Sequence, residues 1–289
     1  MPQQQAGHLR ASVARLDLPA CFGGPIDVVP EERVRAGHLV RTLERQVIPR
    51  LVQARRNSAV GEPAPTAADL KQFVEALLAG DEAGVQAVVQ RLREQGLSVE
   101  SIYLQLLAPA ACALGTLWDQ DHCDFPAVTV GAGRLQRLLR ELSPDFEAEG
   151  AEWLAHPGPT RRVLLVQPPQ EQHSFGLSMV ATFFRREGWL VEGGVGATHP
   201  DPALRAQADW FDVVGYSCGS QSRLGWLRES IAALRLTSRN PTVLVLVGGP
   251  LFVLQPDCVQ WVGADACAAE AGRAPQLAAS LLAALGKHA

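Results

Sequence analysis

The sequence has little excess charge and no feature typical of export. Its 289 residues are 47% hydrophobic and have a formal net charge of −4. No apolar run reaches the length of a membrane span, and the first residues, MPQQQAGHLRASVARLDL, lack the apolar centre of a secretory signal. We therefore expect a cytoplasmic protein with no membrane partner. The slight acidity disfavours direct nucleic-acid binding, which requires a basic face, so any effect on DNA would be exerted through a partner protein.

The cysteines lack the spacing of a metal site. No two of the six form a Cys-x-x-Cys pair, so the sequence predicts neither a structural zinc site nor a disulfide scaffold. They are scattered through predicted helices and strand ends, where we expect small buried hydrophobic residues. The six are Cys21, Cys112, Cys123, Cys218, Cys258 and Cys267.

The apolar pattern divides the chain into an N-terminal arm and two domains. Residues 1–66 comprise an irregular stretch, an amphipathic helix from about Pro30 to Leu51, and a short linker. Residues 67–143 are helical in pattern throughout, with short polar breaks, which predicts an antiparallel bundle. Residues 144–160 are acidic and then rich in Pro and Gly, as is typical of a linker. The four expected bundle helices are 68–78, 82–95, 99–119 and 126–142, with Asp81, Ser98 and Asp124 as N-caps.

From residue 161 to 289, strand and helix patterns alternate. This alternation predicts an α/β domain with a flavodoxin-like (Rossmann-type) parallel sheet of five strands and helices on both faces. In that strand order the loops after the first and third strands form one crevice, where such folds bind ligands. The expected strands are 162–166, 190–192, 212–216, 242–247 and 266–268, and the expected helices are 174–187, 202–208, 222–236, 256–261 and 271–285.

One histidine stands in the loop that follows the first predicted strand. His173 lies between the Pro168-Pro169 turn and Gly176, at the carboxyl end of the strand. Glu171, two residues earlier, could accept a hydrogen bond from one ring nitrogen and leave the other as a metal ligand. A loop histidine beside a carboxylate is more often only solvated, so the assignment depends on further residues.

Small residues follow the third and fourth predicted strands. The third strand is followed by Ser217-Cys218-Gly219-Ser220 and the fourth by Gly248-Gly249-Pro250. Each stretch alone is typical of a turn. With the loop histidine, they predict a narrow channel that runs into the sheet below His173. Such a channel suits a long tail better than a compact substrate.

The three elements resemble the cobalamin-binding motif, which is Asp-x-His-x-x-Gly, then Ser-x-Leu, then Gly-Gly. Here Glu171-x-His173-x-x-Gly176, Ser217-x-Gly219 and Gly248-Gly249 occur in the same order at closely similar spacing. The resemblance implies that His173 replaces the nucleotide base as the lower axial ligand of the cobalt. It also implies that the displaced nucleotide tail fills the slot beside the Ser and Gly-Gly positions.

Longer stretches of the sequence resemble particular groups of cobalamin-binding proteins. The helical region resembles the cap that precedes cobalamin-binding domains in corrinoid methyltransferases and cobalamin-dependent regulators. The stretches EQHSFGLSMVATFFRREGW, LVGGPLF and VIPRLV resemble the AerR/PpaA group of photosynthesis-gene antirepressors. This resemblance implies a regulator of transcription, not an enzyme, that responds to light or redox state. Its implied partner is a redox-responsive repressor of photosynthesis genes of the CrtJ/PpsR type.

The sequence departs from these families at several positions. Glu171 replaces the motif's Asp, and Gly219 replaces its Leu. The positions of a Glu-His pair in the adenosylcobalamin photoreceptors hold Val128 and Thr129, so we expect water or hydroxide above the cobalt in preference to an adenosyl group. Trp118 is expected to cover the corrin. The implied metal ligand is His173, and the implied cofactor-binding residues are Glu171, His173, Ser174, Phe175, Gly176, Ser217, Gly219, Gly248, Gly249, Trp118, Val128 and Thr129.

Two alternative functions are compatible with the sequence. The chain could be a corrinoid carrier for methyl transfer, although the N-terminal 66 residues favour the regulator, because a minimal carrier has little use for an extra helix. It could also be a heme-binding sensor on the same fold, since histidine ligates iron equally well. The small-residue slot argues against heme, which has no nucleotide tail.

Overall fold

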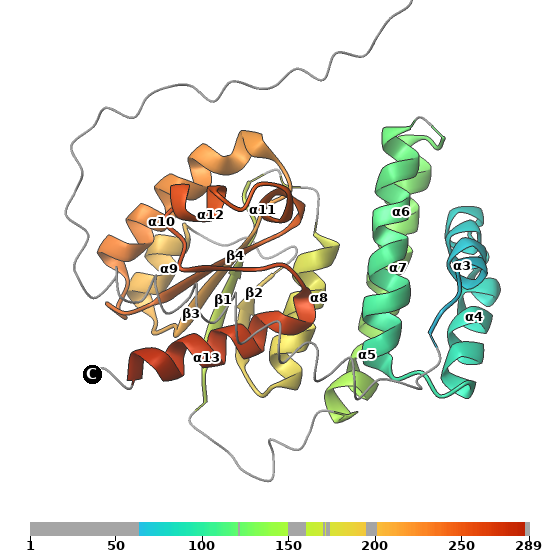
Figure 1. Ribbon diagram of the computed structural model, residues 1–289, viewed down its shortest axis with the longest axis horizontal. Coiled ribbons are helices and arrows are strands. Elements are labelled where there is room, and N and C mark those ends of the chain that lie inside the picture. The colour runs from blue at the N-terminus through green and yellow to red at the C-terminus, as the bar shows by residue number, and fades with distance from the viewer. Residues whose placement is uncertain are drawn as a thin grey trace, which may run out of the picture.

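The computed structural model describes residues 64–120, 122–149, 160–169, 171, 174–194 and 201–286. A helical bundle and a sheet domain lie side by side (Figure 1). The predicted N-terminal helix, residues 150–159 of the expected linker, and His173 lie outside the described residues.

The bundle forms where the periodicity predicted helices. Asp81, Ser98 and Asp124 accept hydrogen bonds from backbone N–H groups three residues further on, as expected of N-caps. Thr66 and Asp69 form a complete capping box at the first helix. The helices are α3 (Ala67–Ala79), α4 (Glu82–Glu94), α5 (Val99–Ile102), α6 (Ala108–Asp119) and α7 (Phe125–Glu149), with a π-helical turn, η2 (Tyr103–Leu107), between α5 and α6.

Two helices differ from their expected bounds. The expected helix 99–119 contains the π-helical turn just before Pro109, which has no N–H to continue the regular hydrogen-bond ladder. The expected end of the last helix at Leu142 is wrong, because α7 continues through Pro144 to Glu149. The buried ring of Phe146 packs 4.7 Å from Tyr103, centroid to centroid, and this contact stabilises the added turns.

The second domain is a five-stranded parallel sheet in the order β2-β1-β3-β4-β5, which confirms the predicted fold. Its strands alternate buried side chains between two faces. Helices α8 and α13 cover one face, and α9 and α10 cover the other. The strands are β1 (Arg162–Val166), β2 (Leu190–Gly193), β3 (Val213–Ser217), β4 (Leu244–Gly248) and β5 (Ala266–Ala268).

The helices of this domain also follow the predicted order, with one addition. Helix α11 was not predicted; it begins at Pro250 directly after the Gly-Gly pair, which looked like a turn, and proline is well suited to the first helical position. Short 3₁₀ turns, η4 (Gln221–Arg223) and η5 (Ala271–Arg273), precede α10 and α13. The helices are α8 (Phe175–Arg186), α9 (Pro202–Ala208), α10 (Leu224–Thr237), α11 (Pro250–Leu254), α12 (Cys258–Trp261) and α13 (Ala274–Gly286).

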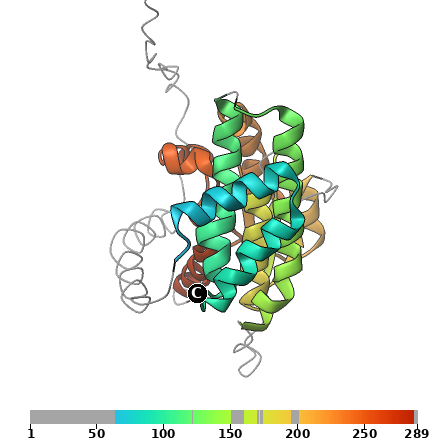
Figure 2. The ribbon, with the colours of Figure 1, turned by 90° about the vertical axis from the view of Figure 1, so that its right-hand side faces the viewer.

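Helix α8 joins the two domains. One side of it packs on the sheet, whereas Met179 and Phe183 belong to the core of the bundle. The Phe183 ring lies 4.9 Å from Phe146 of α7, and Arg186 forms an ion pair of 2.5 Å with Glu100. Helices α6 and α7 therefore lie next to the sheet domain, and α3 and α4 lie outermost (Figure 2).

The stretch from Val99 to Trp118 is long and apolar enough to cross a membrane, by length and composition alone. It passes through the middle of the bundle, where Ile102, Leu106 and Leu107 are fully buried. We attribute its composition to this packing, because the core helix of a bundle meets the same criterion.

Candidate cofactor site

The predicted crevice lies at the carboxyl ends of β1, β3 and β4. These strands are neighbours in the sheet, and Ser217 at the end of β3 pairs with Gly248 at the end of β4. The Cys218 N–H donates to the Gly248 carbonyl over 3.0 Å. The loops that contain Glu171, Gly219 and Gly249 therefore meet at one edge of the sheet, at the point where the strand order reverses.

A hydrogen bond from Gly219 to Glu171 crosses this crevice. The Glu171 Oε2 atom accepts the Gly219 backbone N–H over 2.9 Å, and so ties the loop after β1 to the loop after β3. The Gln167 side-chain amide and the Pro168 carbonyl both bond the backbone of Glu171. The expected contact between Glu171 and His173 stays a prediction, because His173 is outside the described residues.

The Gly-Gly pair after β4 permits close approach of backbones. A Cβ atom on Gly249 would lie 2.4 Å from the Cys218 carbonyl oxygen, and the residue has φ +106°. A Cβ atom on Gly248 would lie 3.1 Å from the Ala268 carbonyl oxygen. The absence of a side chain at both glycines is therefore required for close packing of the backbone, and the end of β4 would move away from its neighbours if either were replaced.

The buried thiol beside these glycines is not a candidate metal ligand. Cys218 is fully buried and donates to the Ser220 carbonyl over 3.3 Å. Burial raises the pKa of this thiol, which favours the uncharged form over the thiolate that metals bind. Among the described residues no three His, Cys, Asp or Glu side chains lie together as a metal-binding group.

The start of α8 lies between the crevice and the bundle. The Ser174 Oγ atom accepts a hydrogen bond of 2.7 Å from the Gln136 side chain of α7, and Phe175 packs on the bundle core. Gly176 is exposed, with no atom within 4 Å of the position a Cβ would occupy. The structure thus places these three predicted residues together. It adds Gln136, which no motif indicated because its partner is 38 residues away in sequence.

The predicted residues of the bundle are divided between its surface and its core. Trp118, at the end of α6, is 42% exposed, and Thr129 of α7 is also exposed. Val128 is half-buried and packs against the bundle core instead. Trp118 and Thr129 are therefore accessible to a ligand, whereas Val128 is accessible only in part.

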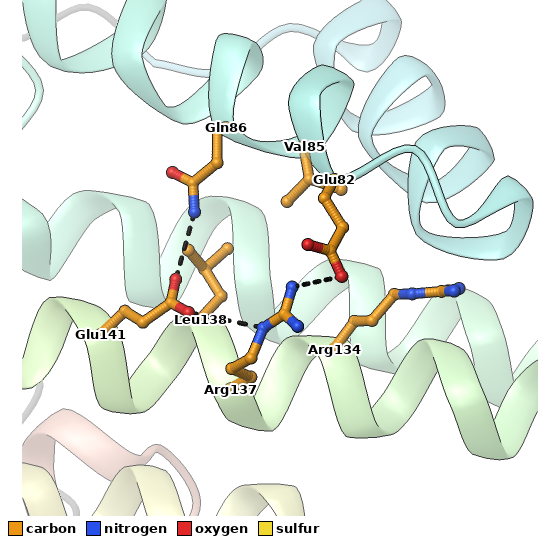
Figure 3. A pocket seen from close by; sticks show the side chains of 7 residues that line it. All are labelled: Glu82, Val85, Gln86, Arg134, Arg137, Leu138 and Glu141. Atoms are coloured by element: carbon orange, nitrogen blue, oxygen red, sulfur yellow. Dashed lines mark hydrogen bonds and ion pairs between the residues drawn. The ribbon is translucent and has the colours of Figure 1, made fainter.

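A separate surface pocket between α4 and α7 is lined by charged side chains that bind one another (Figure 3). Arg137 pairs with Glu82 at 2.8 Å, and Gln86 donates to Glu141 over 3.1 Å. Arg134 donates to the Leu77 carbonyl over 2.6 Å and so satisfies the end of α3. Because these groups already bind one another, we assign the pocket no ligand.

Together these features define a doubly wound α/β protein with a ligand crevice at its switch point and a helical bundle beside it. Comparison with known families agrees. Residues 161–278 match the B12 binding domain family, and residues 69–143 match a second B12 binding domain family. The two matches cover about two thirds of the chain, which therefore belongs to the B12-binding proteins that join a helical cap to a Rossmann-like sheet domain.

Two curated proteins and one solved structure resemble this chain. An uncharacterized 20.5 kDa protein in the bchF-crtJ intergenic region of Rhodobacter capsulatus is 28% identical over 173 residues, which cover 60% of this chain and 88% of the relative. A corrinoid protein of Desulfitobacterium hafniense (strain Y51) is 23% identical over 217 residues, which cover 74% of this chain and 97% of the relative. The structure of the monomethylamine corrinoid protein of Methanosarcina barkeri has the same fold, with a TM-score of 0.59 at 15% identity, over 72% of this chain and 96% of that chain.

The crevice fits cobalamin. The family matches support cobalamin as the ligand, and none of these comparisons supports the heme alternative. In the structure, Ser217 and Gly248 are small residues that end two neighbouring strands, and the Cβ position is open at Gly176, at the start of α8, but not at Gly248. Small residues at the carboxyl ends of the strands are compatible with a ligand at this edge of the sheet.

Proposed function

We propose that this protein is a cobalamin-dependent regulator that binds a transcription factor and performs no catalytic step of its own. The observation on which the proposal rests is the relative in the bchF-crtJ intergenic region, together with the cobalamin-binding module. Proteins encoded beside a gene often act on its product. The proposed partner is accordingly a redox-responsive repressor of photosynthesis genes of the CrtJ/PpsR type.

In this proposal His173 is the lower axial ligand of the cobalt. The loop that contains His173 is anchored before it by Glu171, which is bonded to Gly219, and after it by Ser174, which is bonded to Gln136. We propose that these two anchored neighbours limit the entropy lost when the histidine binds the metal. Bound cobalamin would supply a cobalt centre whose upper ligand responds to light or redox state.

The bundle would cover the other side of the cofactor. Trp118 and Thr129 are exposed near the turn between α6 and α7, and Trp118 offers a flat apolar surface. No Glu-His pair occupies positions 128 and 129, so we propose water or hydroxide as the upper ligand. A change of that ligand would alter how the cap packs, and so the surface offered to the repressor.

The experiment measures DNA binding by a purified repressor of this type. We expect the affinity for its target DNA to change when the cobalamin-loaded protein is added, and to change differently in light and in the dark. The cofactor-free protein and the loaded His173→Ala variant are the matched controls, and both should have less effect. Unchanged DNA binding in every sample would contradict the regulator.

A second candidate function is a corrinoid carrier for methyl transfer. It is favoured by the alignment with the Desulfitobacterium hafniense corrinoid protein, which extends over 97% of that relative. A carrier must accept a methyl group on reduced cobalt and pass it to a second acceptor. If the loaded protein is methylated and demethylated by partner methyltransferases at catalytic rates, the carrier is the correct assignment.

A further inference from the structure

The loop after β3 is attached to the loops on both sides of it. On one side, the Gly219 N–H donates to Glu171 in the loop after β1. On the other side, the Gln221 side-chain amide donates over 2.8 Å to the Oε1 atom of Gln255, the residue that follows α11. Hydrogen bonds therefore link all three loops that meet at the crevice.

Gln255 makes several hydrogen bonds at the end of α11. Its N–H donates to the Leu251 carbonyl over 2.8 Å, and its own carbonyl accepts the Cys258 N–H over 3.1 Å. The Oε1 atom that accepts the Gln221 amide also accepts the Cys258 thiol over 3.5 Å. The half-buried side chain of Gln255 is therefore held in one orientation, with its oxygen toward the loop after β3.

Helix α11 is attached to the core of the domain through one side. Gly248 and Gly249 lead into it, so the connection from β4 has no side chains to pack, and Gly249 has φ +106°. Leu251 and Phe252 are buried in the core that α10 shares, whereas Leu254 is 79% exposed. Apolar packing thus fixes one side of α11, and the hydrogen bond from the loop after β3 fixes its carboxyl end.

A hydrogen bond between two accessible amides contributes little to overall stability, because water can replace either partner. Its effect is local to the two loops that it joins. Those loops begin at Ser217 and at Gly248, which pair at the ends of β3 and β4, where the nucleotide tail of cobalamin is expected. A bond that holds two such loops in one relative position preorganises the surface between them and lowers the cost of binding.

We propose that Gln221 and Gln255 are positioning residues for the nucleotide tail: their hydrogen bond keeps the loops after β3 and β4 at the spacing that the tail requires. The inference rests on the assignment of the tail to the slot beside Ser217 and the Gly-Gly pair, and it does not depend on the regulatory role. In this arrangement the corrin ring lies outside the slot. The pair therefore affects the binding of the tail and not that of the ring.

The test compares cobalamin with cobinamide, which has the corrin ring but lacks the nucleotide tail. Equilibrium dialysis of the full-length protein gives the dissociation constant of each ligand. Gln255→Leu removes the acceptor and keeps the size of the side chain. We expect it to weaken cobalamin binding about fivefold, the effect of one ordinary hydrogen bond, and to leave cobinamide binding unchanged. Gln221→Leu removes the donor and should do the same, and combining the two should cause no additional loss.

Gln90→Leu is the matched control. It removes the side-chain hydrogen bond of another exposed glutamine, to Glu94 on α4, and should change neither dissociation constant. Equal weakening of both ligands in Gln255→Leu and Gln221→Leu would indicate a general loss of order in the crevice and would contradict the inference.

The unmodified protein separates two further outcomes. If it binds cobalamin and cobinamide equally well, the tail contributes nothing and the slot assignment itself is wrong. If it prefers cobalamin and both leucine variants keep that preference, only the positioning role of the pair is wrong. The repressor takes no part in these measurements, so neither result bears on the proposed regulator.

Discussion

Replacement of Gly249 by alanine tests the geometry of the crevice most sharply. The new Cβ would lie 2.4 Å from the Cys218 carbonyl oxygen and 3.1 Å from its carbon, so backbone and not a flexible side chain must move. The residue also has φ +106° and ψ 168°, a region that is essentially restricted to glycine. The backbone conformation costs about 1–3 kcal/mol and the overlap about 1–3 kcal/mol more. We therefore expect Gly249→Ala to lower the free energy of unfolding by about 2–6 kcal/mol.

Gly96→Ala is the matched control. Gly96 also has a positive φ, +92°, but nothing lies within 4 Å of its Cβ position. It isolates the conformational cost, so we expect a loss of about 1 kcal/mol, partly offset by the lower entropy of the unfolded chain. Urea denaturation of the cofactor-free proteins, followed by circular dichroism, measures both. Equal destabilisation by the two variants would refute the argument that the end of β4 must approach the Cys218 backbone.

Glu171→Ala removes the acceptor of the Gly219 N–H and should weaken cobalamin binding about tenfold or more in equilibrium dialysis. Glu171→Gln keeps an acceptor oxygen and should weaken binding less, so equal losses in the two variants would contradict the role of this hydrogen bond. Gly176→Ala should raise the free energy of unfolding by about 0.5–1 kcal/mol, because the new Cβ meets no atom of the protein. The same variant should bind cobalamin more weakly if the ligand occupies that space, and an unchanged affinity would place the ligand elsewhere. Hydrogen bonds from the Thr66 hydroxyl and N–H, and then the Arg91 guanidinium, lower the pKa of Asp69 from its usual value, so the stabilisation is present above the unfolded pKa and is lost as pH falls through the folded pKa. Asp69→Asn should therefore reduce the loss of stability over that acidic range in acid unfolding, and an unchanged curve would count against the capping box as its source.

Much of the fold could be predicted because its signals are local. The run from Val163 to Val166 and its proline turn indicate a buried strand and the loop after it, and the structure has β1 at those residues. The order of the sheet followed from the alternation of strands and helices, since few topologies satisfy that pattern.

The parts that were missed depend on contacts between distant residues. Helix α7 continues beyond Leu142 because Phe146 packs against Tyr103 and Phe183, and the local sequence at Pro144 indicates the opposite. The hydrogen bond between Gln136 and Ser174 could not be predicted for the same reason. Only the folded chain brings the Gln136 side chain within hydrogen-bonding distance of Ser174, 38 residues away in sequence.

We propose that His173 binds the cobalt from below. The most direct test is the electron paramagnetic resonance spectrum of the Co(II) form, recorded for protein with natural histidine and for protein labelled with ¹⁵N-histidine. Coordination by His173 predicts a triplet nitrogen splitting that becomes a doublet on labelling and disappears in His173→Ala. A splitting that labelling does not change would mean that the cofactor's own base remains on the cobalt, and would contradict the account.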